Sequence, residues 1–224
     1  MSSLLFHLYI LLAILVLYNL YTLIAIFLLP VSSDFPTQTL GATPYEYLMF
    51  TQQWPKAVNK NSRLTKFTIH GLWPSNFSGK KLICTGTNFS KSKMPPELEE
   101  ELNISWPDVE RGRNWGFWEH EYNKHGTCSE DIFDQTKYFE LANKMRKTLD
   151  IAQMLKKRKI VPVVAAIKKE NQNKSPSIRC KERKGSAELL LVEVVVCYDH
   201  DGKEVIDCPD NRTCGSPNQS ILYV

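Results

Sequence analysis

One segment near the C-terminal end of this chain constrains its fold more strongly than any other. Residues 188–198, with the sequence ELLLVEVVVCY, are mostly β-branched or aliphatic and extend over the length of a strand. A run of this kind is typical of a central strand that is buried on both faces. Patterns typical of helices occur elsewhere, and no βαβ repeat divides the chain, so the sequence predicts an α+β fold with an interior sheet.

Two further segments have the composition of strands. Residues 45–53 are rich in aromatic side chains, and residues 67–70 alternate residues that favour strands. We expect Gly71 and Pro74 to break the second strand, which places His70 near its end.

Helices are expected in four places. Pro95 and Pro96 are suited to the first turn of a short acidic helix, and apolar residues recur at helical spacing in 138–149. The segments predicted to be helical are 95–102, 115–125, 138–149 and 151–159, and the polar segments predicted to be surface loops are 56–66 and 75–93.

The first 33 residues have the features of a targeting segment. They contain no Asp, Glu, Lys or Arg, and small residues at 31–33 provide a signal-peptidase site before Asp34. The alternative is a retained signal-anchor, because the apolar run could span a bilayer and no basic residue precedes it. We expect a cleaved signal peptide at 1–33, one domain at 34–224, secretion to the extracellular space and no stable membrane association.

The cysteines and the sequons also fit the secretory pathway. The chain has six cysteines and no CxxC pair, which favours three disulfides over a zinc site. Six Asn-X-Ser/Thr sequons are candidate glycosylation sites. The cysteines are Cys84, Cys128, Cys180, Cys197, Cys208 and Cys214, and the sequons are at Asn76, Asn88, Asn103, Asn173, Asn211 and Asn218.

The chain is mildly basic, with a formal net charge of +4 and a pI of about 8.6. Basic residues cluster at 156–159, 168–169 and 181–184. Such a surface favours a polyanionic partner such as nucleic acid, although each cluster taken alone also fits a solvated helix end or loop.

Residues 117–128 (FWEHEYNKHGTC) concentrate side chains capable of acid–base chemistry. On a helix, Glu121 and His125 are four residues apart and share a face, Lys124 lies beside them, and Gly126 ends the helix. The alternative for this segment alone is an amphipathic helix whose charges are merely solvated.

Two catalytic interpretations of this segment fail. A zinc site of the HExxH kind needs histidines four residues apart, whereas His120 and His125 are five apart and lie about 140° from each other around a helix. Lys124 would also repel a dication, so no metal site is predicted. A Cys128 nucleophile is disfavoured because an even set of cysteines in a secreted chain indicates disulfides.

Metal-free cleavage of a phosphodiester uses the unusual residues without any cofactor. The reaction needs a base for the 2′-hydroxyl proton and an acid for the departing 5′ oxygen, and two imidazoles suit both tasks. His70 and a histidine of 117–128 could supply them, while Lys124 could stabilise charge on the phosphate. Trp73 and Phe117 could stack on bases.

These residues carry a resemblance to a known family. Residues 67–74 (FTIHGLWP) and 117–128 resemble the two signature segments of the ribonuclease T2 family. Residues 52–55, 104–108 and 194–198 are similar to plant members, so that the resemblance extends over 45–214.

The resemblance implies roles for individual residues. His125 would be the general base, His70 the general acid and His120 a phosphate-binding residue. Glu121 and Lys124 would polarise the phosphate and stabilise the transition state. Trp73 and Phe117 correspond to base-stacking aromatic residues, and the products would be 2′,3′-cyclic phosphates that open to 3′-phosphates.

The resemblance also implies a central antiparallel sheet flanked by helices and the pairings Cys84–Cys128, Cys180–Cys214 and Cys197–Cys208. Two departures stand out: segment 56–66 lacks two cysteines that are usual in plant relatives, and Ser75 stands where some relatives have an acidic base-reading residue. Base preference therefore cannot be carried over.

Three physiological roles remain open at this point. The basic pI and the Asn76 sequon favour a gametophytic self-incompatibility ribonuclease, for which a recognition partner of the F-box type is implied. His120 favours an S-like enzyme of RNA turnover, phosphate recycling or defence. A catalytically weak recognition protein is the third, and in each case we expect a monomer.

Overall fold

The computed structural model describes residues 7, 14–19, 45–155, 160–182, 188–210, 214 and 221–222. The chain divides into two units, 1–40 and 41–224, and the described residues 14–19 of the first unit are helical and exposed. Within the described part of the chain, no helix is long and apolar enough to cross a membrane. The basic cluster 156–159 and the sequons at Asn211 and Asn218 lie outside it.

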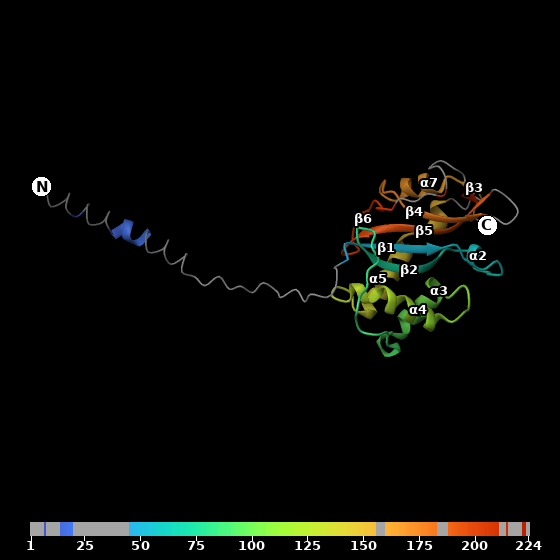
Figure 1. The fold of residues 1–224 in the computed structure, drawn as a ribbon, viewed down its shortest axis with the longest axis horizontal. Helices are drawn as coiled ribbons and strands as arrows, with labels where there is room; N and C mark the ends of the chain where they lie inside the picture. The colour runs from blue at the N-terminus through green and yellow to red at the C-terminus, as the bar shows by residue number, and fades with distance from the viewer. Residues whose placement is uncertain are drawn as a thin grey trace. The chain divides into compact units, whose positions relative to one another are not determined.

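The second unit is built on a seven-stranded sheet with the order β2-β1-β5-β7-β3, in which β4 and β6 also pair with β5 (Figure 1). The strands are β1 (Tyr47–Gln53), β2 (Thr68–Ser75), β3 (Ile160–Val161), β4 (Ser177–Glu182), β5 (Leu189–Asp199), β6 (Val205–Ile206) and β7 (Ile221–Leu222). The pairings are antiparallel except between β5 and β7, which pair in parallel at Leu190 and Leu222. The predicted α+β class is confirmed, with the 188–198 segment as the central strand β5.

Strand β2 differs from the expectation. It does not break at Gly71 but continues to Ser75, with Gly71 opposite Thr51 and Pro74 opposite Leu48 of β1. Because β2 ends the strand order, a proline without an N–H is tolerated there. His70 is therefore the third residue of β2 rather than a residue near its end.

A bulge in β2 decides how His70 is presented. The register with β1 shifts so that Ile69 pairs with Gln52 and Gly71 pairs with Thr51, which leaves His70 without an opposing residue. Such bulges bend a strand locally and re-aim a side chain. The fold thus turns His70 out of the regular alternation of the strand.

The helices are α2 (Pro55–Val58), α3 (Pro96–Ser105), α4 (Asn114–Lys124), α5 (Gln135–Thr148), α6 (Ile151–Met154) and α7 (Val163–Glu170), with 3-10 turns η1 (Lys91–Lys93) and η2 (Gly126–Ser129). The predicted loop 56–66 begins inside helix α2, and α3 continues three residues beyond Leu102. Helix α6 ends at Met154, and residues 156–159 of the predicted helix 151–159 lie outside the described residues. In Figure 1, α3, α4 and α5 gather beside β2, while α7 lies beyond β4.

An aromatic core joins these helices to β2. Trp106, Trp118, Tyr122 and Tyr138 are almost completely buried, and Trp118 Nε1 donates to the Trp106 carbonyl over 2.8 Å. Two of these side chains also bond the backbone of β2: Trp106 Nε1 donates to the His70 carbonyl over 2.9 Å, and the Tyr138 hydroxyl donates to the Leu72 carbonyl over 2.7 Å. The core therefore fixes the strand segment that carries His70.

The structure contains the three disulfides Cys84–Cys128, Cys180–Cys214 and Cys197–Cys208. These are the pairings that the family resemblance implies. Cys84–Cys128 ties η2, directly after α4, to the loop that follows β2. Of the described sequons, Asn88, Asn103 and Asn173 are exposed, whereas Asn76 is only 7% exposed and its Oδ1 accepts from the Ser78 hydroxyl over 2.6 Å.

Candidate active site

Helix α4 supplies most of the predicted site residues. It carries Phe117, His120, Glu121 and Lys124, and it ends as predicted, because the His125 N–H donates to the Glu121 carbonyl over 2.9 Å and the chain then enters η2. Gly126 is required at this point, since a Cβ would collide with the Tyr122 ring. His120 and Lys124 are exposed, whereas Glu121 is only 3% exposed.

Trp73 joins the two signature segments. Its Nε1 donates to Glu121 Oε2 over 2.8 Å. Its ring centre lies 5.2 Å from that of His70 and 5.4 Å from that of His125. The predicted convergence of Glu121 and His125 is thus observed, with both residues in contact with one indole, and His70 completes the group.

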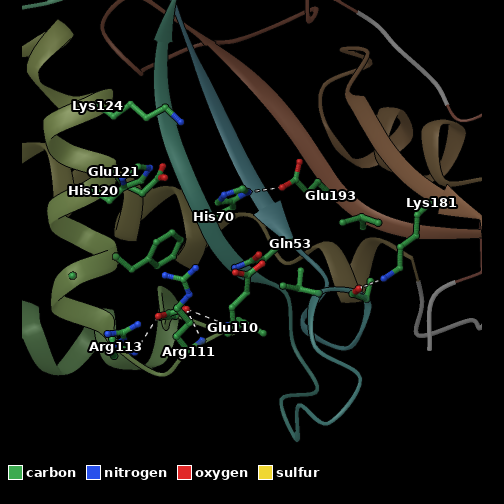
Figure 2. A pocket seen from close by; sticks show the side chains of 17 residues that line it. Gln53, His70, Glu110, Arg111, Arg113, His120, Glu121, Lys124, Lys181 and Glu193 are labelled. Atoms are coloured by element: carbon green, nitrogen blue, oxygen red, sulfur yellow. Dashed lines mark hydrogen bonds and ion pairs between the residues drawn. The ribbon is translucent and has the colours of Figure 1, made fainter.

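Five of the seven predicted catalytic and base-binding residues border an open cleft of about 850 Å³. Its lining includes His70, Phe117, His120, Glu121 and Lys124, whereas Trp73 and His125 are not part of the described lining. The Phe117 ring stacks on the His70 ring at a centroid distance of 6.0 Å and an interplanar angle of 30°. Figure 2 shows the α4 side chains on one side of His70 and Glu193 on the other.

The surroundings of the two histidines shift their pKa values in opposite directions. Burial lowers the pKa of His70, but the hydrogen bond and charge of Glu193, together with the charge of Glu121, outweigh burial and raise it. Burial lowers the pKa of His125 to about 3, and the charges of Lys124, His120 and His70 act in the same direction. At neutral pH His125 is therefore a free base, while His70 holds a proton more strongly than an ordinary histidine does.

The pKa values of Glu121 and Glu193 are also shifted in opposite directions. Burial raises the pKa of Glu121, although the hydrogen bond from Trp73 and the charges of His70, His120 and Lys124 oppose the rise. Burial also acts to raise the pKa of Glu193, but its bonds and ion pairs with His70 and Arg179 outweigh this and lower it.

Sequence reasoning missed Glu193 and Arg179. The Nδ1 atom of His70 forms a hydrogen bond with Glu193 Oε1, and Arg179 donates to Glu193 Oε2 over 2.8 Å. The sequence does contain an indication of this role. Glu193 is the only charged residue in 189–198, and a buried charge requires a partner. The identity of that partner could not be obtained from local sequence.

The loop before α4 was also missed. Asp108 accepts hydrogen bonds from the backbone N–H groups of Glu110, Arg111 and Arg113, and all four residues line the cleft (Figure 2). Lys181 of β4 lines it as well. Among the described residues, no group of three or more His, Cys, Asp or Glu side chains is arranged to hold a metal ion.

Comparison with known proteins settles the family. The model of the ribonuclease T2 family matches residues 45–208. The chain belongs to this family. Ribonuclease MC from Momordica charantia is 37% identical over 189 residues, which cover 77% of this chain and 98% of that protein.

Other T2 ribonucleases of plants are similarly related. Ribonuclease S-6 from Pyrus pyrifolia is 35% identical over 212 residues, covering 84% of this chain and 90% of that protein. The solved structure of ribonuclease MC1 from bitter gourd seeds matches with a TM-score of 0.70 at 36% identity, over 80% of this chain and 100% of the other. The resemblance found in the sequence is thus confirmed, and the chain is a T2-type endoribonuclease with RNA as its substrate.

Proposed function

We propose that this ribonuclease cleaves single-stranded RNA by metal-free transphosphorylation, with His125 as the base and His70 as the acid. Neutral His125 removes the 2′-hydroxyl proton as the 2′ oxygen attacks phosphorus. Protonated His70 donates its proton to the 5′ oxygen as the P–O5′ bond breaks, leaving a 2′,3′-cyclic phosphate. Water then opens the ring to a 3′-phosphate, with the two histidines exchanging roles.

The observation that carries this proposal is the opposite pKa shift of the two imidazoles beside Trp73. A base must be free of its proton and an acid must retain it at the same pH. The burial of His125 favours the first state, and the carboxylates around His70 favour the second.

The remaining residues supply charge and binding. Lys124 and His120 lie on α4 beside Glu121 and would hold the phosphate, whose equatorial oxygens gain charge in the transition state. Phe117, which stacks on His70, and Trp73 are the proposed contacts for bases.

The test is digestion of a short single-stranded RNA in the presence of EDTA, with products identified by mass spectrometry. Wild type is expected to release cyclic phosphates, and His70→Ala and His125→Ala are each expected to lose about 10²- to 10⁴-fold in rate. His200→Ala is the matched control, because this histidine stacks on Tyr45 outside the cleft. A wild type that forms no cyclic phosphate would instead be a catalytically weak recognition protein.

We infer secretion from the 1–33 segment, with cleavage before Asp34 and a single ribonuclease domain at 34–224. The sequons and three disulfides support passage through the secretory pathway. N-terminal sequencing of the protein purified from a plant expression host is expected to begin near Asp34. A start at residue 1 or 2 would favour the signal-anchor.

We further propose an extracellular role in RNA turnover, phosphate recycling or defence, with gametophytic self-incompatibility as the second candidate. The low exposure of Asn76 weakens the sequon that favoured self-incompatibility, whereas His120 is in place at the cleft. Transcripts confined to the pistil would favour self-incompatibility and its F-box-type partner, and broad or phosphate-responsive transcripts would favour turnover. Size-exclusion chromatography tests the expected monomer.

A further inference from the structure

Glu193 is a buried carboxylate whose two oxygens are both engaged. It interrupts the apolar strand β5, and its side chain is 9% exposed. Oε1 accepts the bond from His70 Nδ1, and Oε2 accepts a 2.8 Å bond from Arg179. Burying a carboxylate in such a strand costs free energy unless the charge has partners. The bonds to His70 and Arg179 provide those partners.

Four neighbouring strands, β4, β5, β1 and β2, bring these groups together. Glu193 lies directly opposite Arg179 of β4 on one side and Gln53 of β1 on the other. The bulge in β2 carries His70 out of register with β1, and the His70 ring reaches Glu193 across β1 (Figure 2). Because the backbones of these four strands are paired in one sheet, the carboxylate is held in place relative to the imidazole.

We propose that Glu193 is a positioning residue for His70, accepting the Nδ1–H bond and thereby making Nε2 the nitrogen that delivers the proton to the leaving oxygen. The bond made by one ring nitrogen decides the tautomer and orientation of the other. An ionised carboxylate also stabilises the imidazolium form. The inference rests on the proposed function of His70 as the general acid.

The other charges around His70 make Glu193 the dominant partner. Glu121 of α4 adds a second negative charge, and Arg179 of β4 adds a positive one that opposes protonation. His125 also interacts electrostatically with His70, and its proton-free state spares His70 a positive neighbour. Removal of the Glu193 charge would leave the Arg179 guanidinium unpaired beside His70, so both effects would disfavour the imidazolium.

Arg179 has a supporting position. Its guanidinium carbon lies 5.3 Å from the Trp73 ring centre, while its NH1 bonds Glu193. Since Trp73 Nε1 holds Glu121, one chain of contacts joins both carboxylates that face His70. Arg179 therefore restricts the rotamer of Glu193 through Oε2, the carboxylate oxygen that His70 does not engage.

The test compares Glu193→Gln with wild type in the RNA cleavage assay. The amide keeps the size of the side chain and removes its charge. We expect kcat to fall at least about tenfold with KM little changed. The alkaline limb of the rate–pH profile should move to lower pH by about one unit. Glu193→Asp, which restores the charge, should recover part of both effects.

Glu101→Gln is the matched control, because Glu101 is also an ion-paired carboxylate, bonded to Lys147 over 2.7 Å and outside the cleft. This substitution should leave the cleavage rate and the alkaline limb of the rate–pH profile unchanged. A Glu193→Gln enzyme with an unshifted limb, or one that loses rate only through a higher KM, would overturn the positioning role. Failure of wild type to form cyclic phosphates would overturn the proposed function and this inference together.

The proposal can also be tested on the wild-type protein, so that the test does not depend on whether Glu193→Gln folds. Nitrogen-15 NMR of the histidine side chains should show His70 as the Nδ1–H tautomer above its pKa, with the assignment confirmed by loss of the signal in His70→Ala. An Nε2–H tautomer would overturn the proposal without any Glu193 variant.

Discussion

His70 and His125 are the same residue type in one site, and their neighbours give them different chemistry. His70 faces two carboxylates, Glu193 and Glu121, which favour its protonated form. Burial, and after it the charge of Lys124, lower the pKa of His125 and so oppose its protonation. The proposed division between acid and base therefore rests on local electrostatics, as it does in enzymes that hold two like groups in unlike protonation states.

The pH dependence of kcat/KM follows from these shifts. His125 must be unprotonated, and its pKa is lowered to about 3, so activity should fall on the acid side only as the pH approaches that value. His70 must be protonated, and its raised pKa should keep activity up to a pH above the ordinary histidine value of about 6.5. A profile measured in EDTA whose alkaline limb lies below 6.5 would contradict the assignment.

Lys124 should act mainly on the transition state. We expect Lys124→Met to lower kcat by about 10²- to 10³-fold, because one charged group that stabilises the phosphate oxygens would be lost. Steady-state kinetics with an RNA dinucleotide measure the effect. Lys144→Met, at an exposed lysine of α5, is the control, and equal kinetics for the two variants would rule out this role.

At the scale of elements, side chains of β2 and α4 pack so closely around position 71 that only glycine fits there. A Cβ on Gly71 would collide with Trp73 Nε1 and Glu121 Oε2, the two atoms that form the bond between the signature segments. The same strand also holds the bulge at His70. The contact between side chains of this strand and this helix thus sets the distance between His70, the proposed acid, and Glu121.

Gly71→Ala is expected to destabilise the fold by about 1–3 kcal/mol through overpacking and to lower kcat as the Trp73–Glu121 bond is displaced. Gly116→Ala should do the reverse to stability, raising it by about 0.5–1 kcal/mol, because Gly116 is helical and has nothing within 4 Å of its Cβ position. Denaturant unfolding of both variants measures the two changes in the free energy of unfolding. Equal stability of the two variants would show that the close approach is relaxed.

At the scale of the whole molecule, the excess positive charge of +4 matters where it meets RNA. Among the described residues, four Lys and Arg side chains from three parts of the fold line the cleft: Arg111, Arg113, Lys124 and Lys181. Each phosphate that they neutralise releases counterions from the RNA, so binding should weaken as salt rises.

Binding of an RNA oligonucleotide to the His125→Ala variant tests this arrangement without turnover. The slope of log Kd against log salt should be about 0.7 per phosphate contact, or roughly 2–3 for three or four contacts. Adding Arg111→Gln and Arg113→Gln should reduce the slope by up to about 1.4, whereas Lys144→Met should leave it unchanged. A slope near zero would show that the cleft does not bind the backbone.

Local pattern was enough for the central strand, the helices α4 and α5 and the residues of the two signature segments. It failed where pairing overrode local preference. Gly71 and Pro74 predict a break in the strand, but pairing with β1 continues β2 past both residues. The polar segment 56–66 predicts a loop, but Pro55 and the residues after it form a short helix.

The sequence alone determined which chemical groups this protein has and the short-range geometry that turns Glu121, Lys124 and His125 toward one helix end, because a helix repeats within a few residues. Only the tertiary structure decided the partner of His70. Glu193 is 123 positions away in the chain, and it reaches the imidazole through a strand order, a register and a bulge that no local pattern encodes. Contacts of that range are decided by how the whole sheet packs.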